Sequence, residues 1–463
     1  MFERLRNWIA DKLRVEMPAT AAHDDEINRE LRTLDHWRGK LSGLPRTIEC
    51  SVIELLSGDS HEPYFTGPGR IEIRSETEIR FFVYGTAENG PAAFRKLIKA
   101  REHPYDPLEQ FQVHATDYQG VEWAGGWSAV DYFDDAKEGW PLTGELQGLT
   151  TLATGPWVSK RSSVELLLIP SIDLPTTKTL VTISRIGDRK VRSIWEAGEH
   201  SVSLLGTTIH FTYEQGGEAL WITAETSPQL KHPFAENWLT EPLRILLGIT
   251  VYPRMVARNL GDGTAHVWLR SAPTTREPSA IGLLQPFALE GGRREAFWKL
   301  YADILTMIAK AGSFEAHPLT HLYVELAHAQ HGSRWVITLT LASTVEALAG
   351  TLMTAEDRKP EFSDALLRSM KTHLRAWKDD IGLRDRLLNN LGLVSKRSIL
   401  AFMRGLAARG VVNPDHVQTW SKVRNSVMHG EMVEPWSSEE GDARMKELLQ
   451  LVHALSRARI AKG

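Results

Sequence analysis

The sequence predicts an α+β protein of more than one domain, with a large β-rich region first and an all-helical region after it. Three observations predict this. The chain has 463 residues, which is more than one hydrophobic core usually holds. Apolar residues recur at every second position from residue 47 to about residue 272, and at helical spacing beyond residue 291. The predicted parts are an N-terminal helical segment (1–45), a β-rich region (46–285) and an all-helical domain (292–463).

The composition is that of a globular protein. Apolar residues make up 42% of the chain and charged residues 24%, which excludes a disordered or collagen-like chain. The net charge is −4, so any nucleic-acid surface has to be a local basic patch. Cys50 is the single cysteine, which excludes disulfide scaffolds, thiolate zinc sites and iron–sulfur clusters. A reducing, cytoplasmic location fits this cysteine usage best.

The N-terminal segment predicts two helical pieces. Residues 1–13 place apolar side chains at helical spacing, but charges interrupt them and no apolar core of a signal peptide is present. Such a helix lies either on a membrane surface or against the protein itself; the mixture of acids and bases favours the second. A second helical piece is expected at 26–41. No run reaches the ~18 uninterrupted apolar residues of a membrane span, so we expect no membrane partner.

The β-rich region contains legible hairpins and one helical interruption. Short alternating runs meet at residues that suit tight turns, such as Gly216 and Gly217, where positive φ costs little. GPGR at 67–70 is interpreted as a turn that opens a strand, not as a phosphate loop. The expected hairpins span 69–85 (turn 75–77), 179–195 (turn 187–188) and 207–225 (turn 216–217); a helical insertion is expected at 236–251 and a further strand at 265–272.

The C-terminal domain is expected to consist of eight helices. A proline-rich stretch at 272–286 marks the boundary before them. The expected helices span 293–311, 318–330, 334–354, 361–380, 384–391, 396–408, 415–429 and 440–460.

The sharpest motif lies in the penultimate expected helix. The sequence contains no phosphate-binding loop, no Rossmann glycine pattern, no His-Glu-x-x-His and no nucleophile elbow, which disfavours nucleotide hydrolysis. Residues 420–430 instead read Trp-Ser-Lys-Val-Arg-Asn-Ser-Val-Met-His-Gly. Arg424, Asn425 and His429 in this stretch resemble the Arg, polar residue, then His motif of HEPN domains, and Gly430 follows as it often does in that family. Residues 341–353, which include Glu346, more weakly resemble the first long core helix of the family.

The resemblance implies a fold, an activity and an oligomer. HEPN domains are small helical bundles, many of them metal-independent ribonucleases that act as dimers in defence and toxin systems. A large N-terminal region before a C-terminal HEPN domain resembles the layout of Apea-like HEPN proteins of bacterial anti-phage systems. The resemblance therefore implies an endoribonuclease that acts in abortive infection on structured RNA, such as tRNA. It also implies a homodimer through the C-terminal helical domain and no cofactor or metal. The N-terminal region would sense a phage-derived trigger.

The three motif residues suit this chemistry. Cleavage of RNA without a metal needs a base for the 2′-hydroxyl, an acid for the leaving 5′-oxygen and positive charge at the phosphate. His429 can transfer the protons near neutral pH, and the Arg424 guanidinium can bind two phosphate oxygens. Asn425 and His429 are four residues apart and share a helix face, so Asn425 can orient the imidazole.

Arg424 and His429 do not share that face. On a straight helix they point about 140° apart. Arg424 therefore either reaches round the helix or meets the histidine of a second protomer across a two-fold axis. The alternative interpretation is ordinary capping, because cations favour the C-terminal end of a helix and glycine suits the cap. A second alternative is a non-catalytic HEPN module that binds RNA or protein and dimerises.

Other candidate sites remain weaker. A basic segment before the motif predicts an RNA-binding surface or a solvated helix face; its candidate residues are Lys396, Arg397, Arg404 and Lys422. Four histidines fall on one stripe, where a metal site or a plain surface stripe are both open; they are His317, His321, His328 and His331. Trp123 and Trp127 form either a stacking platform or part of the sheet core.

Overall fold

The structure is a computed structural model. It describes residues 33–41, 44–57, 62–132, 139–176, 181–186, 189–194, 198–214, 217–251, 253–271, 280–284, 294–313, 316–359, 362–394, 398–428, 433 and 435–462. The expected helix at 1–13 lies outside these residues.

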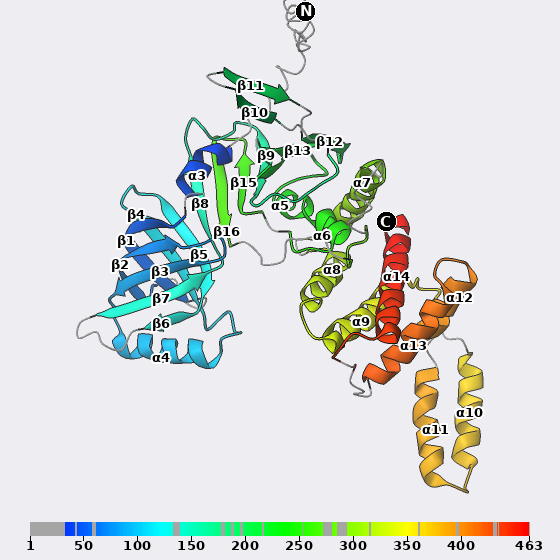
Figure 1. The fold of residues 1–463 in the computed structure, drawn as a ribbon. Helices are drawn as coiled ribbons and strands as arrows, with labels where there is room; N and C mark the ends of the chain where they lie inside the picture. Colours follow the sequence, from blue (N-terminus) through cyan, green and yellow to red (C-terminus); the bar gives the residue numbers. More distant parts are fainter. Residues whose placement is uncertain are drawn as a thin grey trace, which may run out of the picture. The chain divides into compact units, whose positions relative to one another are not determined.

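The chain divides into two compact units. One unit comprises Met1–Glu236 and Tyr252–Thr274 and is called here the β-rich unit; the other comprises Asn237–Val251 and Thr275–Gly463 and is called the helical unit. This confirms the predicted α+β class, with a β-rich N-terminal part and a helical C-terminal part (Figure 1).

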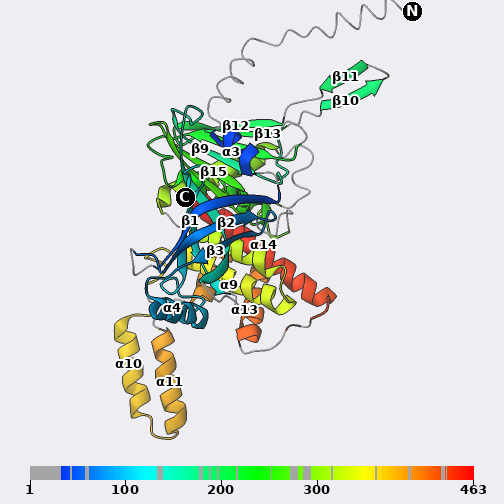
Figure 2. The same cartoon turned by 90° about the vertical axis from the view of Figure 1, so that its left-hand side faces the viewer.

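The β-rich unit contains a long antiparallel sheet. Among the described residues, fourteen strands pair in the order β12-β13-β14-β9-β15-β16-β8-β5-β4-β1-β2-β3-β7-β6, and β10 and β11 form a separate hairpin (Figures 1 and 2). The elements are α3 Thr33–Leu41, β1 Arg46–Ser57, β2 Phe65–Ile73, β3 Ile79–Gly85, α4 Gly90–Glu102, β4 Phe111–Asp117, β5 Glu122–Ser128, β6 Val130–Tyr132, β7 Trp140–Leu146, β8 Gly148–Thr154, β9 Ser162–Leu168, β10 Val181–Ile186, β11 Arg189–Ile194, β12 Glu199–Leu204, β13 Thr207–Tyr213, β14 Leu220–Glu225, β15 Met255–Leu260 and β16 Thr264–Arg270.

Alternation of apolar residues explains these strands. In β1 every second side chain from Ile53 onward is buried, after a register shift between Cys50 and Ile53. The three predicted hairpins are confirmed as the pairs β2–β3, β10–β11 and β13–β14. The interpretation of 67–70 as a turn is wrong, because these residues lie inside β2. A Cβ on Gly67 would lie 1.9 Å from the carbonyl oxygen of Tyr84, so glycine permits the close approach.

A buried carboxylate binds the backbone of α3. The Glu165 carboxylate on β9 accepts hydrogen bonds from the backbone N–H groups of Thr33 (2.7 Å) and Leu34 (3.0 Å). Asn259 on β15 donates its amide to the same carboxylate (2.9 Å). These bonds tie α3 to two strands of the sheet, β9 and β15. Of the helical piece expected at 26–41, residues 33–41 are described and form α3; residues 26–32 lie outside the described residues.

The helical unit consists mainly of long helices after residue 293. Its helices, with α5 at the division between the units, are α5 Ala235–Trp238, α6 Glu241–Leu247, α7 Arg294–Ala311, α8 Pro318–Ala329, α9 Arg334–Leu352, α10 Asp364–Ala376, α11 Ile381–Val394, α12 Ile399–Ala408, α13 Pro414–Met428 and α14 Glu439–Lys462. The segment expected as one helical insertion at 236–251 contains α6, which packs against α7 and α8. It therefore belongs largely to the helical unit.

α9 is the central helix of this unit. It packs against α8, α12, α13 and α14. Ser333 caps its first turn, because the Ser333 hydroxyl oxygen accepts a hydrogen bond from Val336 N–H. In the described part of the chain, α9 is also the helix that is long and apolar enough to cross a membrane by length and composition. Packing explains this apolar character, because eight residues of α9, most of them apolar, are buried.

Local capping groups shift two expected helix boundaries. The helix expected at 361–380 spans only Asp364–Ala376, because Ser363 caps its start and Trp377 its end. The helix expected at 384–391 begins earlier, at Ile381, because the Asp380 carboxylate accepts a hydrogen bond from Leu383 N–H.

Candidate functional site

The candidate site lies on α13. This helix begins after Asn413, whose side-chain oxygen accepts a hydrogen bond from Asp415 N–H. Trp420 is 2% exposed and donates its indole N–H to the carbonyl oxygen of Ala342 on α9 (3.0 Å). The Thr419 hydroxyl donates to Glu447 on α14 (2.6 Å). α13 is therefore fixed to α9 and α14 about one turn before the motif begins.

Arg424 is held by a bidentate ion pair. Its Nε lies 2.7 Å from Glu346 Oε2 and its Nη2 lies 3.0 Å from Glu346 Oε1. The guanidinium carbon also lies 6.0 Å from the centre of the Trp420 ring. The hydrogen bonds that Arg424 donates to the Glu346 carboxylate raise the pKa of Arg424, so the guanidinium stays charged. Both side chains remain more than one-third exposed, so solvent reaches the pair.

The pair leaves part of the guanidinium for another ligand. A guanidinium has five N–H donors in a planar fork, and Glu346 engages the edge formed by Nε and Nη2. Within the described residues, the Arg424 guanidinium donates to Glu346 on α9 rather than to the last carbonyls of α13. This orientation is not that of a simple C-terminal cap.

The other motif residues are only partly described. Asn425 is exposed on α13, adjacent to Arg424. His429 and Gly430 lie outside the described residues, so the sharing of a face by Asn425 and His429 stays a prediction. The sequence places Glu346 within the apolar run 341–353, but no spacing pairs it with Arg424, which is 78 residues away.

The candidate RNA-binding residues also fall into two groups. Arg404 on α12 and Lys422 on α13 are exposed. Neither lies within ion-pair distance of a carboxylate in the part of the chain that the structure describes. Lys396 and Arg397 lie outside the described residues. The two described bases therefore remain available to an anionic ligand.

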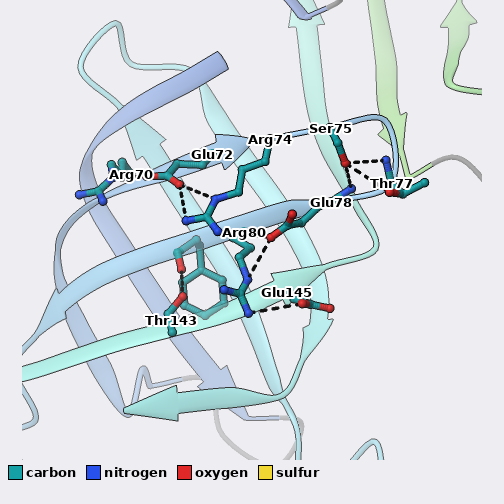
Figure 3. A network of polar contacts seen from close by, with 10 residues as sticks. Arg70, Glu72, Arg74, Ser75, Thr77, Glu78, Arg80, Thr143 and Glu145 are labelled. Carbon is teal, nitrogen blue, oxygen red and sulfur yellow. Dashed lines mark hydrogen bonds and ion pairs between the residues drawn. The ribbon is translucent and has the colours of Figure 1, made fainter. Parts of the chain in front are cut away.

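On a charged face of the β-rich unit, by contrast, the arginines are paired with carboxylates. Along β2, β3 and β7 each arginine faces a glutamate (Figure 3). Arg70 and Arg74 bind the same carboxylate, Glu72, at 2.6 and 2.8 Å, and Arg80 lies 3.4 Å from Glu145. The hydrogen bond from Arg70 lowers the pKa of Glu72. The arginines of this face are thus already neutralised.

The histidine stripe does not converge on one point. His317 is buried and caps α8: its Nδ1 accepts a hydrogen bond from Leu319 N–H (3.1 Å). Burial, with the charge of Arg459, lowers the pKa of His317 to about 4. His321, His328 and His331 are exposed. Across the described ranges, no three His, Cys, Asp or Glu side chains gather closely enough to hold a metal ion.

The two tryptophans of β5 do not form one platform. Trp123 is 5% exposed and packs edge-on against Trp37 of α3, with 5.5 Å between the ring centres. The register of β5 shifts after it, and Ser128 rather than Trp127 is buried. Trp123 lines the wall of a cavity of about 210 Å³, which is bordered by Trp37, Arg46, Thr47, Ile48, Glu49, Asp117, Tyr118, Gln119 and Val121.

Comparisons with known proteins were made for family models, curated proteins and solved structures, and none matches this chain. The interpretation of the site therefore rests on its own residues.

Proposed function

We propose that the helical unit is a metal-independent endoribonuclease of the HEPN type, with Arg424, Asn425 and His429 at its catalytic site. It cleaves RNA, such as tRNA, in the cytoplasm during an abortive response to phage infection. The β-rich unit receives the trigger and controls the nuclease. Two copies of the chain form the working enzyme.

The observation that supports this proposal most is the orientation of Arg424. A bidentate contact to Glu346 fixes the guanidinium on α13, five residues before His429 in the sequence. A preoriented guanidinium stabilises a crowded phosphate without reorganising during the reaction. The exposed bases Arg404 and Lys422 in the same unit add positive charge for an RNA backbone.

The reaction conserves all its atoms within the RNA strand. The 2′-oxygen attacks the adjacent phosphorus as its proton leaves, and the bond from phosphorus to the 5′-oxygen breaks. The leaving oxygen gains a proton, which gives a 2′,3′-cyclic phosphate and a 5′-hydroxyl. His429 transfers protons, Asn425 orients its imidazole and Arg424 binds the phosphate oxygens.

One observation favours a different role. The pair between Arg424 and Glu346 also ties α13 to α9, which is what a non-catalytic, RNA- or protein-binding dimerisation module would need. The two roles differ in what loss of Glu346 does, because Glu346 itself has no part in the chemistry.

The test is cleavage of total RNA by the purified full chain in EDTA. We expect His429→Ala and Arg424→Ala each to lower the rate by at least about 100-fold. Glu346→Gln keeps the guanidinium and is expected to lose far less. Equal losses in Arg424→Ala and Glu346→Gln would instead indicate a structural tie. RNA binding without cleavage by the native chain would favour the binding module, and a fully active His429→Ala variant would disprove the site.

A further inference from the structure

The hairpin of α10 and α11 is the part of the helical unit with the least packing. These helices run side by side and project from the other helices of the unit (Figures 1 and 2). They pack against each other, and no other described element packs extensively against either. Leu367 is the one residue of α10 with a buried side chain. The structure therefore leaves this hairpin, named here the α10–α11 arm, almost uncovered.

Apolar side chains gather on the arm. Six of the eighteen large apolar residues that are exposed in the described structure lie between residues 362 and 387. On α10, Leu366 is 50% and Met370 44% exposed; on α11, Leu383 is 46% and Leu387 38% exposed. A monomer rarely leaves so many large apolar side chains clustered in water. The cluster therefore marks an interaction surface.

These four residues form one face. On α10, Leu366 and Met370 are four residues apart and lie on one stripe, beside Leu367, the buried residue of this helix. On α11, Leu383 and Leu387 repeat the same spacing. Helical geometry sets the α10 stripe about 80° from the buried Leu367, and the α11 stripe about 80° from Arg384, which is less exposed than its neighbours. With Leu367 and Arg384 turned to the opposite helix, the antiparallel pair places both stripes on the same side. The arm thus presents a continuous apolar strip rather than scattered residues.

The arm has the form of half a bundle. Helices of 13 and 14 residues are marginal in water without tertiary packing. Two helices alone cannot enclose a core, whereas two such hairpins can form a four-helix bundle around their joined apolar strips.

We propose that the α10–α11 arm binds the arm of a second copy of this chain and forms an antiparallel four-helix bundle. A two-fold interface needs one self-complementary surface, and one continuous strip meets that need. The proposal names a surface for the pairing that the proposed nuclease also calls for, but it rests on the arm alone.

Size and charge favour a second copy over other occupants. A stable interface uses about 20–30 residues on each side, and the arm supplies two helices of 13 and 14 residues. Residues 364–394 contain six Lys or Arg and four Asp or Glu, so two arms repel each other little. An RNA or an anionic membrane would be matched by a predominantly basic face, and the strip is apolar.

The test is the molar mass of the full chain by light scattering after size exclusion. We expect the native chain to elute as a dimer of 52.0 kDa subunits. The double variant Leu366→Glu with Leu387→Glu puts two charges into the strip and is expected to weaken the dimer at least about 100-fold. The matched control, Thr372→Glu with Asn389→Glu, adds the same charge on the opposite side and should leave the dimer intact.

A second measurement locates the contact. Cys50 is the only native cysteine and is buried, so an engineered thiol reports alone. Met370→Cys lies in the middle of α10 and is expected to cross-link two chains with a short bis-maleimide. Thr372→Cys, on the other side of the same helix, is expected to cross-link far less.

Three outcomes would overturn the proposal. A native chain that is monomeric at 50 µM, or a dimer that both double variants leave unchanged, removes the arm as the interface. Equal weakening by both double variants removes the apolar strip as its cause. Far-ultraviolet circular dichroism confirms that each variant is folded, and a milder pair, Leu366→Ala with Leu387→Ala, repeats the test without added charge. RNA cleavage is measured separately, so loss of the dimer and loss of the His429 chemistry are distinguishable.

Discussion

α9 and α10 have the same kind of N-terminal cap but differ in how much of each helix is packed against other helices. Each starts at a serine whose hydroxyl accepts a hydrogen bond from the third following N–H, at Ser333 and Ser363. Yet α9 has eight buried residues and packs against four helices, whereas α10 has one buried residue and, among the described elements, packs extensively against α11 alone. Local signals therefore determine where a helix starts, while residues distant in the sequence determine what covers it.

We expect the largest effect from replacing two tryptophans, one in a covered helix and one in the uncovered arm. Trp420 of α13 is buried against α9, and Trp377 is a half-buried residue that ends α10 and donates its N–H to Asp379. We expect Trp420→Ala to destabilise the helical unit by about 3–5 kcal/mol, since it leaves a cavity and removes the indole hydrogen bond to the carbonyl oxygen of Ala342. Trp377→Ala should cost about 1 kcal/mol or less.

Hydrogen exchange of peptides from α9 measures this contrast. A local probe is needed because a chain with two units does not unfold in one two-state step. Trp436→Ala, which removes a 64% exposed ring in the same unit, is the control and should leave exchange unchanged. Equal loss of protection in the Trp420 and Trp377 variants would contradict the contrast between the covered and uncovered helices.

Much of the fold could be predicted from local pattern. Alternation over 69–85 predicts the β2–β3 hairpin, and helical spacing over 334–354 predicts α9. The features that the sequence did not predict depend on contacts between residues distant in the chain, or on the close approach of two backbone segments. No local pattern shows that α6 packs with α7 and α8, or that the backbone of β3 approaches Gly67 closely.

The candidate site was predictable in composition but not in contacts. The motif around Arg424 and Asn425 is visible in the sequence because its spacing is local. The partner Glu346 is 78 residues away and has no spacing that ties it to the motif. For His317 the local spacing was a poor guide. Helical spacing places it on a stripe with His321, but in the structure His317 is buried and caps α8.

α3 provides the second test, because a carboxylate more than 130 residues away holds this nine-residue helix. Burial, with the charge of Asp35 adding to it, raises the pKa of Glu165 to about 7, against 4.5 in a free glutamate. The folded state therefore binds more protons than the unfolded state between about pH 4.5 and 7. As the pH rises through that window, the free energy of unfolding of the β-rich unit should fall by about 1–3 kcal/mol in all. Above about pH 7 it should level off.

Urea unfolding of the β-rich unit at pH 5, 6, 7 and 8 checks this dependence. Glu165→Gln cannot ionise and is expected to flatten the curve between pH 5 and 7. Glu145→Gln, which removes a carboxylate that is 73% exposed, should leave the slope as in the native chain. An undiminished slope in Glu165→Gln would assign the effect to another group.

The smallest effect concerns the ion pair at the candidate site itself. Because both side chains are more than one-third exposed, solvent screens the pair between Arg424 and Glu346. A double-mutant cycle with Arg424→Ala and Glu346→Ala is expected to give a coupling of about 0.5–1 kcal/mol in urea unfolding. The exposed pair between Arg444 and Glu440 on α14 is the reference and should couple by less than about 0.5 kcal/mol. A coupling above about 2 kcal/mol would mean that the pair holds α13 to α9 in the way that Trp420 does, and loss of RNA cleavage in Arg424→Ala would then report on folding. A small coupling, with cleavage lost in Arg424→Ala alone, separates the positioning of the guanidinium from the stability of the bundle.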